Sequence, residues 1–462
     1  MNIKVKKVSS PRPDHTGEPV ILSEETIEQR KQKLLKLMKN NGLSSLIVYA
    51  DKEHGSNFEY LTGFIPRFEE GLQILNQDGH STLILGNENF NKVKFSRVKS
   101  EGVHCPLLSL PNQPMNDFKP FHTYLEQVNI DNSGKIGLVG WKLLSNDFDD
   151  FHHNFDLPAF IVGACQDVFG KEKLVNATQV YMHPGKGARA NNNANEIAHY
   201  EYGSSLASDA VLSAINELEE GIKETTIGNL LNRDGQYQNV VTISAFGERF
   251  EHANIYPTNR QLKSGDKVAV TVSYKGGLSS RSGYAVSNLE ELESVDEGYF
   301  ENVVIPYFKA YNWWLKNISI GVKGEDFYNA FAKYYPQETY GWELCPGHLT
   351  SDEEWMSSPF YEGSDAIVQN GSIFQVDFIP VQEGHNGISA ESTIALADEG
   401  LIQEIKEQYP LLWERIEARK MYLKEQLNIE LKSEVLPLAS TLGYYRPFLL
   451  NSEKALVIDD EK

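Results

Sequence analysis

The sequence predicts an α+β protein of two domains: a smaller α/β domain first, then a larger one in which strands and helices form separate blocks. Three observations lead to this prediction. The chain has 462 residues, which exceeds one ordinary domain. Its first part alternates helix-like and strand-like segments, as α/β domains do, whereas its second part contains long strand-and-turn stretches between helices. Hydrophobic residues make up 40% of the chain, enough for substantial cores.

The charge and the cysteines limit the classes of partner that we expect. The formal net charge is -21, and an acidic surface repels both nucleic acids and anionic membranes. No apolar run reaches the roughly 18 residues of a membrane-spanning helix, and the first residues lack the apolar core of a secretion signal. The three cysteines are far apart and form no CxxC pair, which is typical of a reducing compartment. We therefore expect a cytoplasmic protein with no nucleic-acid partner and no membrane partner.

The first predicted domain comprises residues 1–178. Its first helix is expected over residues 27–41, with Ser23 as the N-cap and Gly42 at the end. The Asp78–Gly79 pair between two apolar runs predicts a β-hairpin. A linker rich in asparagine is expected over residues 179–195. The predicted strands are residues 45–50, 72–75, 81–85 and 135–140.

The second predicted domain comprises residues 196–462. A long amphipathic helix is expected over residues 196–219, and a β-rich run at residues 268–272 follows the Gly265–Asp266 turn. The other predicted segments are a short helix from residue 225, strands within residues 240–285 and 342–396, and helices at residues 297–316, 325–333 and 401–425.

Five short motifs, in order along the chain, resemble the creatinase, prolidase and aminopeptidase P group of the M24 metallopeptidase superfamily. The resemblance covers most of the chain, and it implies a creatinase/prolidase-like N-terminal domain followed by a pita-bread catalytic-type domain. The third motif is closest to creatinase, whose chemistry needs no metal. The motifs are SNFEYLTGF at residues 56–64, EEGI at 219–222, His252 followed by PTNR at 257–260 and SGD at 264–266, PGH at 346–348, and the paired strands at 371–377 and 389–393.

In metal-bearing members of this group, two aspartates, one histidine and two glutamates hold two divalent ions. The position of the first aspartate falls on Thr271. The second falls on Arg281, or on Ser280 if the gap shifts by one residue. Two divalent ions need bridging carboxylates, and an arginine would repel a cation. We therefore expect a degenerate site without the pair of ions, and we predict no metal ligand and no cofactor.

The three remaining positions keep residues that can bind a metal or transfer a proton. His348 matches the histidine, Asp377 the first glutamate and Glu391 the second. A single ion held by these three residues stays open as an alternative. Asp377 and Glu391 lie in apolar strands, where an unpaired charge is costly. Direct function, pairing with His348, or a salt bridge to Arg281 would each explain them.

The predicted catalytic residues are His252, His348, Asp377 and Glu391. A histidine of near-neutral pKa can transfer protons, and an acidic partner can orient it. The resemblance then implies a hydrolase of a C–N bond in a small substrate, such as a proline-containing dipeptide or a guanidino or amide compound. The alternative is an inactive member that uses the same cleft for binding, with both histidines as inherited structural residues. The expected partner of the hydrolase is a small-molecule or dipeptide substrate, whereas the inactive member would act as a binding or interaction module. The resemblance also implies a homodimer.

Overall fold

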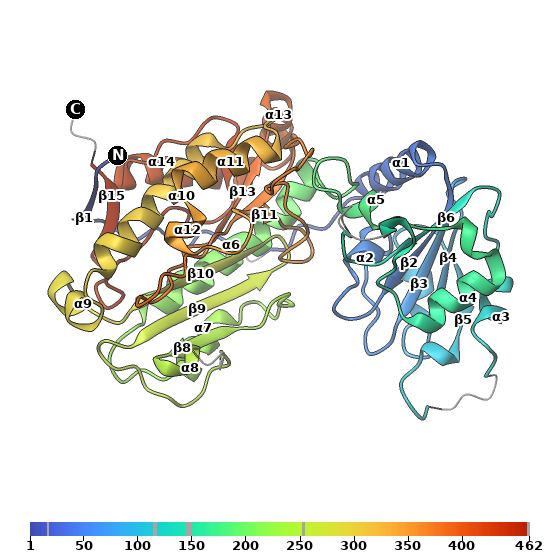
Figure 1. The fold of residues 1–462 in the computed structure, drawn as a ribbon, viewed down its shortest axis with the longest axis horizontal. Helices are drawn as coiled ribbons and strands as arrows, with labels where there is room; N and C mark the ends of the chain where they lie inside the picture. The colour runs from blue at the N-terminus through green and yellow to red at the C-terminus, as the bar shows by residue number, and fades with distance from the viewer. Residues whose placement is uncertain (16–17, 114–117, 145–149, 252–254, 460–462) are drawn as a thin grey trace. The chain divides into compact units, whose positions relative to one another are not determined.

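The computed structural model describes residues 1–15, 18–113, 118–144, 150–251 and 255–459 (Figure 1). His252 lies outside the described residues. The chain forms two compact units, Leu22–Ala190 and Met1–Ile21 together with Asn191–Lys462. The first residues join the second unit because β1 (Ile3–Lys7) pairs antiparallel with β15 (Lys454–Ile458). The predicted N-terminal domain, residues 1–178, differs from the first unit in this respect. No helix in the described part of the chain is long and apolar enough to span a bilayer.

The unit Leu22–Ala190 is built on one six-stranded mixed sheet with the order β5-β4-β3-β2-β6-β7. The predicted hairpin at Asp78–Gly79 is confirmed, since β3 and β4 pair antiparallel across it. Three neighbouring pairs in the sheet are parallel. The strands are β2 (Leu43–Ala50), β3 (Gly71–Asn76), β4 (Ser81–Leu85), β5 (Glu101–His104), β6 (Lys135–Val139) and β7 (Leu174–Asn176).

The helices of this unit begin with α1, whose predicted N-cap is confirmed. The Ser23 hydroxyl accepts a hydrogen bond from the Thr26 amide at 3.1 Å. Leu34 and Met38 of this helix are completely buried. The α-helices are α1 (Glu24–Asn40), α2 (Ser56–Thr62), α3 (His122–Glu126), α4 (Ala159–Phe169) and α5 (Thr178–Met182).

The second unit contains a three-stranded antiparallel sheet, β10-β9-β8, and a four-stranded antiparallel sheet, β11-β12-β13-β14. A bridge between Ser282 and Ser389 joins them. Helix α6 runs along β9 and β10 and also contacts β13 (Figure 1). This mixed arrangement gives the predicted α+β class. The strands are β8 (Ile243–Phe246), β9 (Lys267–Tyr274), β10 (Gly277–Tyr284), β11 (His348–Leu349), β12 (Ile373–Val376), β13 (Ser392–Leu396) and β14 (Val435–Pro437).

The single helix predicted over residues 401–425 is wrong, because two helices occupy this segment. Tyr409 has φ -133° and ψ 60°, which is not helical, and Pro410 follows it. A proline disfavours the helical conformation of the residue before it, so the chain turns and starts again. The helices of this unit are α6 (Ala194–Asn216), α7 (Glu224–Leu231), α8 (Glu248–Glu251), α9 (Leu289–Val295), α10 (Ile305–Asn317), α11 (Gly324–Tyr334), α12 (Gln337–Tyr340), α13 (Glu399–Gln408) and α14 (Pro410–Leu427), with a π-turn at Phe300–Val304 before α10.

A buried ion-pair network ties the N-terminal segment to two helices of this unit. The guanidinium of Arg419 on α14 donates to both carboxylate oxygens of Asp14, each at 2.7 Å. It also donates to Glu201 on α6 at 2.7 Å. Burial lowers the pKa of Arg419, but the two carboxylates outweigh burial and raise it. The first residues are therefore part of this unit's core.

We expect Arg419→Met to lower the free energy of unfolding by about 3–5 kcal/mol, because it leaves two carboxylates without their shared cation. Urea denaturation measures the change. The matched control is Lys424→Met, which removes an exposed ion pair with Glu430 and should change stability by less than about 1 kcal/mol. Equal effects from the two substitutions would contradict the importance of the buried network.

Candidate active site

His348 is positioned by the glycine before it and by the strand beside it. Gly347 has φ +96°, and a Cβ there would lie 3.0 Å from the Trp314 ring, so the position requires glycine. The Gly347 amide donates to the carbonyl of Asp377 at 2.7 Å. In the antiparallel pair of β11 and β12, His348 lies opposite Gln375. His348 is therefore held beside the end of β12, directly where Asp377 follows.

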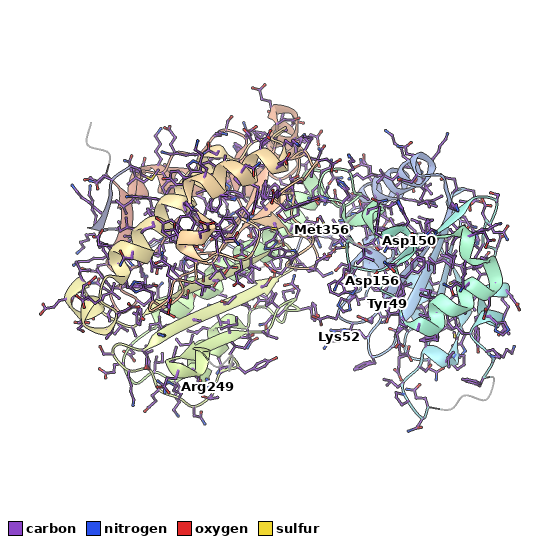
Figure 2. All side chains as sticks on the ribbon, in the orientation of Figure 1. Tyr49, Lys52, Asp150, Asp156, Arg249 and Met356 are labelled. Atoms are coloured by element: carbon purple, nitrogen blue, oxygen red, sulfur yellow. The ribbon has the colours of Figure 1, made fainter. Side chains whose placement is uncertain are left out.

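The loop after β11 brings two further side chains to the imidazole. The Leu349 amide donates to the Ser357 carbonyl at 2.7 Å, and the Met356 amide donates to Leu349 at 3.0 Å, so the loop closes on itself. Met356, at the end of this loop, is labelled in Figure 2. The closure places the Trp355 ring in a stack on His348, with 4.0 Å between ring centroids. It also places Glu354 against the imidazole.

Three of these side chains form what we call the histidine–carboxylate cluster: His348, Glu354 and Asp377. The imidazole Nε2 lies 3.0 Å from Glu354 Oε1 and 3.6 Å from Asp377 Oδ2. His348 is 0% exposed and Asp377 4%. Among the three explanations for Asp377, the structure shows the pairing with His348.

The charges of the cluster are strongly coupled. Burial lowers the pKa of His348, but the Glu354 and Asp377 carboxylates outweigh it and raise the value to about 10. Burial also raises the pKa of Asp377, although His348 lowers it. The Oδ1 atom of Asp377 is buried without a hydrogen-bond partner among the described residues. At neutral pH the imidazole is therefore a cation next to an incompletely satisfied carboxylate.

Glu391 lies next to this cluster, just before β13. Burial raises its pKa well above the usual range, and the charges of Asp377 and Glu354 add to the shift. A hydrogen bond from Ser280 lowers the pKa by a smaller amount. One imidazolium cannot neutralise the carboxylates of Glu354, Asp377 and Glu391 together. Burial and the neighbouring carboxylates therefore favour the protonated form of Glu391.

Hydroxyl groups occupy the two positions that the resemblance assigns to metal-binding aspartates. Thr271 on β9 and Ser280 on β10 are register partners, and Thr271 Oγ1 donates to Ser280 Oγ at 2.9 Å. Ser280 Oγ lies 2.6 Å from Ser389 Oγ. Ser280, rather than Arg281, therefore shares a face with Thr271. Neutral hydroxyls that bind one another do not supply the bridging negative charge that two divalent ions need.

Arg281 does not form the salt bridge that was one of the three explanations for the buried acids. Its buried guanidinium donates to the backbone carbonyls of Ser280 at 2.6 Å, Thr441 at 2.6 Å and Glu391 at 3.2 Å, while Nε donates to Tyr444 at 3.1 Å. Within the described residues, the hydrogen bonds of this guanidinium all go to backbone carbonyls and none goes to a carboxylate. The predicted salt bridge to Asp377 or Glu391 is therefore wrong, because four carbonyls satisfy this guanidinium.

Sequence reasoning missed Glu354, Trp355 and Ser389. Asp377 and Glu391 stand out as acids in apolar strands, but Glu354 stands in a polar run, DEEW, that suggests only a solvated loop. Its approach to His348 depends on the Leu349–Ser357 pairing, which has no local sequence signal. The predicted role of His252 falls outside the described residues.

The raised pKa of His348 gives a measurable pH dependence. Because the pKa in the folded state, about 10, exceeds the ordinary value of 6.5, the stabilisation is fully present below pH 6.5. It is lost as the pH rises through about 10. We expect the His348 C–H resonances in an NMR titration, with a chelator present, to stay at imidazolium positions past pH 8. Assignment uses His348→Gln, and a transition near the ordinary value would contradict the cluster geometry.

Comparisons with known proteins place this geometry in a known fold. Residues 30–106 match the creatinase/prolidase N-terminal domain. No curated protein sequence matches the chain significantly. An Xaa-Pro dipeptidase from Bacillus anthracis has a similar structure, with a TM-score of 0.58, 14% identity and coverage of 80% of this chain and 94% of that one.

Two further solved structures agree with this result. The prolidase from Pyrococcus horikoshii has a TM-score of 0.58 and 16% identity, covering 80% of this chain and 95% of that one. The X-Pro aminopeptidase from Thermotoga maritima has a TM-score of 0.60 and 16% identity, with the same coverage. The predicted resemblance is thus confirmed at the level of fold: residues 30–106 match the creatinase/prolidase N-terminal domain, and the chain shares the α+β fold of these dipeptidase, prolidase and aminopeptidase structures.

Proposed function

We propose that this protein hydrolyses a C–N bond in a small substrate, such as an Xaa-Pro dipeptide, without a two-metal centre. The observation that carries the proposal is the buried Asp377 Oδ1, which has no hydrogen-bond partner among the described residues although it lies beside the His348 imidazole. Buried polar atoms in folded proteins are usually satisfied, and unsatisfied ones concentrate where a ligand or a reaction completes them.

The groups of the site have distinct roles in this proposal. Glu391, whose pKa is raised, is the acid that gives a proton to the leaving nitrogen, while the Glu354 carboxylate takes a proton from the water that attacks the substrate carbon as the C–N bond breaks. Glu354 has a 15% exposed side chain, and its carboxylate meets an incoming substrate first. The buried guanidinium of Arg281 fixes the backbone of Glu391 and so positions this acid. The fold comparison supports a dipeptide as the substrate. We also propose a homodimer, which the motif resemblance implies, and a cytoplasmic location, which the sequence composition favours.

A second candidate function is binding without turnover, and one observation favours it. Trp355 stacks on the imidazole, and His348, Asp377 and Glu391 are between 0% and 6% exposed. A substrate must displace part of this cover before it reaches the reacting groups. If that displacement does not occur, a peptide or another protein binds at the surface beside Glu354 and Trp355 without reaching the buried groups.

A turnover assay distinguishes the two functions. We expect release of free amine from at least one member of a panel of Xaa-Pro dipeptides, guanidino acids and small amides. Glu391→Gln should lower kcat/KM by about 100-fold or more, because general acid catalysis typically contributes about 10²–10⁴-fold. His348→Ala should have a similar effect, since it removes the charge that the carboxylates share.

The matched control is Glu362→Gln, which removes an exposed carboxylate outside the site and should leave kcat/KM unchanged. Circular dichroism checks that each variant is folded. Undiminished turnover in both Glu391→Gln and His348→Ala would remove the catalytic assignment. No turnover across the panel, together with dipeptide binding by calorimetry, would replace hydrolysis with the binding function.

A further inference from the structure

The histidine–carboxylate cluster brings three different ligand atoms to one point. One atom each from His348, Glu354 and Asp377 lies within 4.8 Å of the other two. Nε2 of the imidazole is 3.0 Å from Glu354 and 3.6 Å from Asp377. Ligand atoms about 2.0–2.1 Å from a tetrahedral ion lie roughly 3.3–3.4 Å from one another. The distance from Nε2 to Glu354 is slightly shorter than this separation, and the distance from Nε2 to Asp377 is slightly longer.

The orientation of the imidazole suits a metal ligand. Nδ1 lies 3.2 Å from the Leu349 carbonyl oxygen, and a carbonyl can only accept a hydrogen bond, so Nδ1 donates the proton. The other nitrogen, Nε2, then faces the two carboxylates. Histidines that bind metals commonly donate their second ring N–H to a backbone carbonyl, which fixes the tautomer. A bound cation would therefore replace the proton on Nε2, while Nδ1 keeps its proton on the side of the Leu349 carbonyl.

Two atoms of the cluster are unsatisfied as the chain stands. Oδ1 of Asp377 is buried and has no hydrogen-bond partner among the described residues, and Nε2 of His348 lies 3.0 Å from Glu354 Oε1 without the geometry of a hydrogen bond. His348 is 0% exposed and Asp377 4%, so bulk water does not satisfy them. The incomplete hydrogen bonding of these buried atoms is an observation independent of the clustering of acids. It points to a missing ligand within the histidine–carboxylate cluster.

We propose that His348 Nε2 and the carboxylates of Glu354 and Asp377 bind one divalent transition-metal ion, with no second ion at Thr271 and Ser280. Two carboxylates offset the two charges of the ion, and one imidazole with two carboxylates suits Zn²⁺ or Mn²⁺ better than Mg²⁺. Glu354 belongs to none of the motifs that the sequence shares with metal-bearing relatives. The two-ion arrangement is thus replaced by a single-ion site with a new ligand.

Binding of the ion is measured without turnover, so this part of the inference does not depend on the proposed function. Only a role of the ion in catalysis rests on the proposed function. The full-length chain is dialysed against a chelator and then titrated separately with Zn²⁺, Mn²⁺ and Mg²⁺ by calorimetry. We expect one equivalent of Zn²⁺ or Mn²⁺ per chain and much weaker binding of Mg²⁺. Substitution with Co²⁺ should give the visible absorption of a low-coordinate ion with nitrogen and oxygen ligands.

Variants then assign the ligands. Glu354→Gln, which keeps the shape of the side chain, should weaken binding at least tenfold, whereas Glu362→Gln should not change it. If Glu354→Gln is unfolded by circular dichroism, Asp377→Asn makes the same test. Binding of no ion, binding of two equivalents, or one equivalent unaffected by both ligand variants would each overturn the inference. A bound ion without turnover of any substrate would instead contradict the proposed hydrolysis.

Discussion

Three carboxylates, those of Glu354, Asp377 and Glu391, lie in a part of the molecule that water barely reaches, and one imidazole faces them. An isolated buried charge is costly, so the acids must be paired, protonated or bound to a cation. The structure shows pairing of Glu354 and Asp377 with His348, and burial favours the protonated form of Glu391. This need for charge balance explains why the pKa of His348 is raised, and it is the reason to expect a divalent ion in place of the Nε2 proton.

The charge of the site also depends on the uncharged hydroxyl groups beside the histidine–carboxylate cluster. Thr271, Ser280 and Ser389 contribute no charge, and their mutual hydrogen bonds satisfy them without a cation. Arg281 does not take the place of a metal-binding aspartate beside Thr271. Its guanidinium instead donates hydrogen bonds to four backbone carbonyls. The fold of the prolidase structures is therefore shared, and hydroxyl groups stand at the two positions that the resemblance assigns to metal-binding aspartates. Chemistry at this site, as we propose it, depends on one imidazole and three acids.

Local signals in the sequence were sufficient for much of the fold. Ser23 as an N-cap, the Asp78–Gly79 hairpin and the apolar strands around Asp377 each reflect the conformational preference of a few neighbouring residues. Features that depend on distant contacts could not be predicted in the same way. The β1–β15 pairing joins the two ends of the chain. The choice of Ser280 over Arg281 depends on the length of the β9–β10 turn, and Glu354 reaches His348 only through the closure of its loop.

The most direct test of the central claim, that one buried cluster replaces a pair of metal sites, is anomalous X-ray diffraction from crystals grown with Mn²⁺. The account predicts one anomalous peak per chain, bounded by His348, Glu354 and Asp377, with no density for an ion between Thr271 and Ser280. Two peaks a few ångströms apart, with one of them against the Thr271 and Ser280 hydroxyls, would contradict the account.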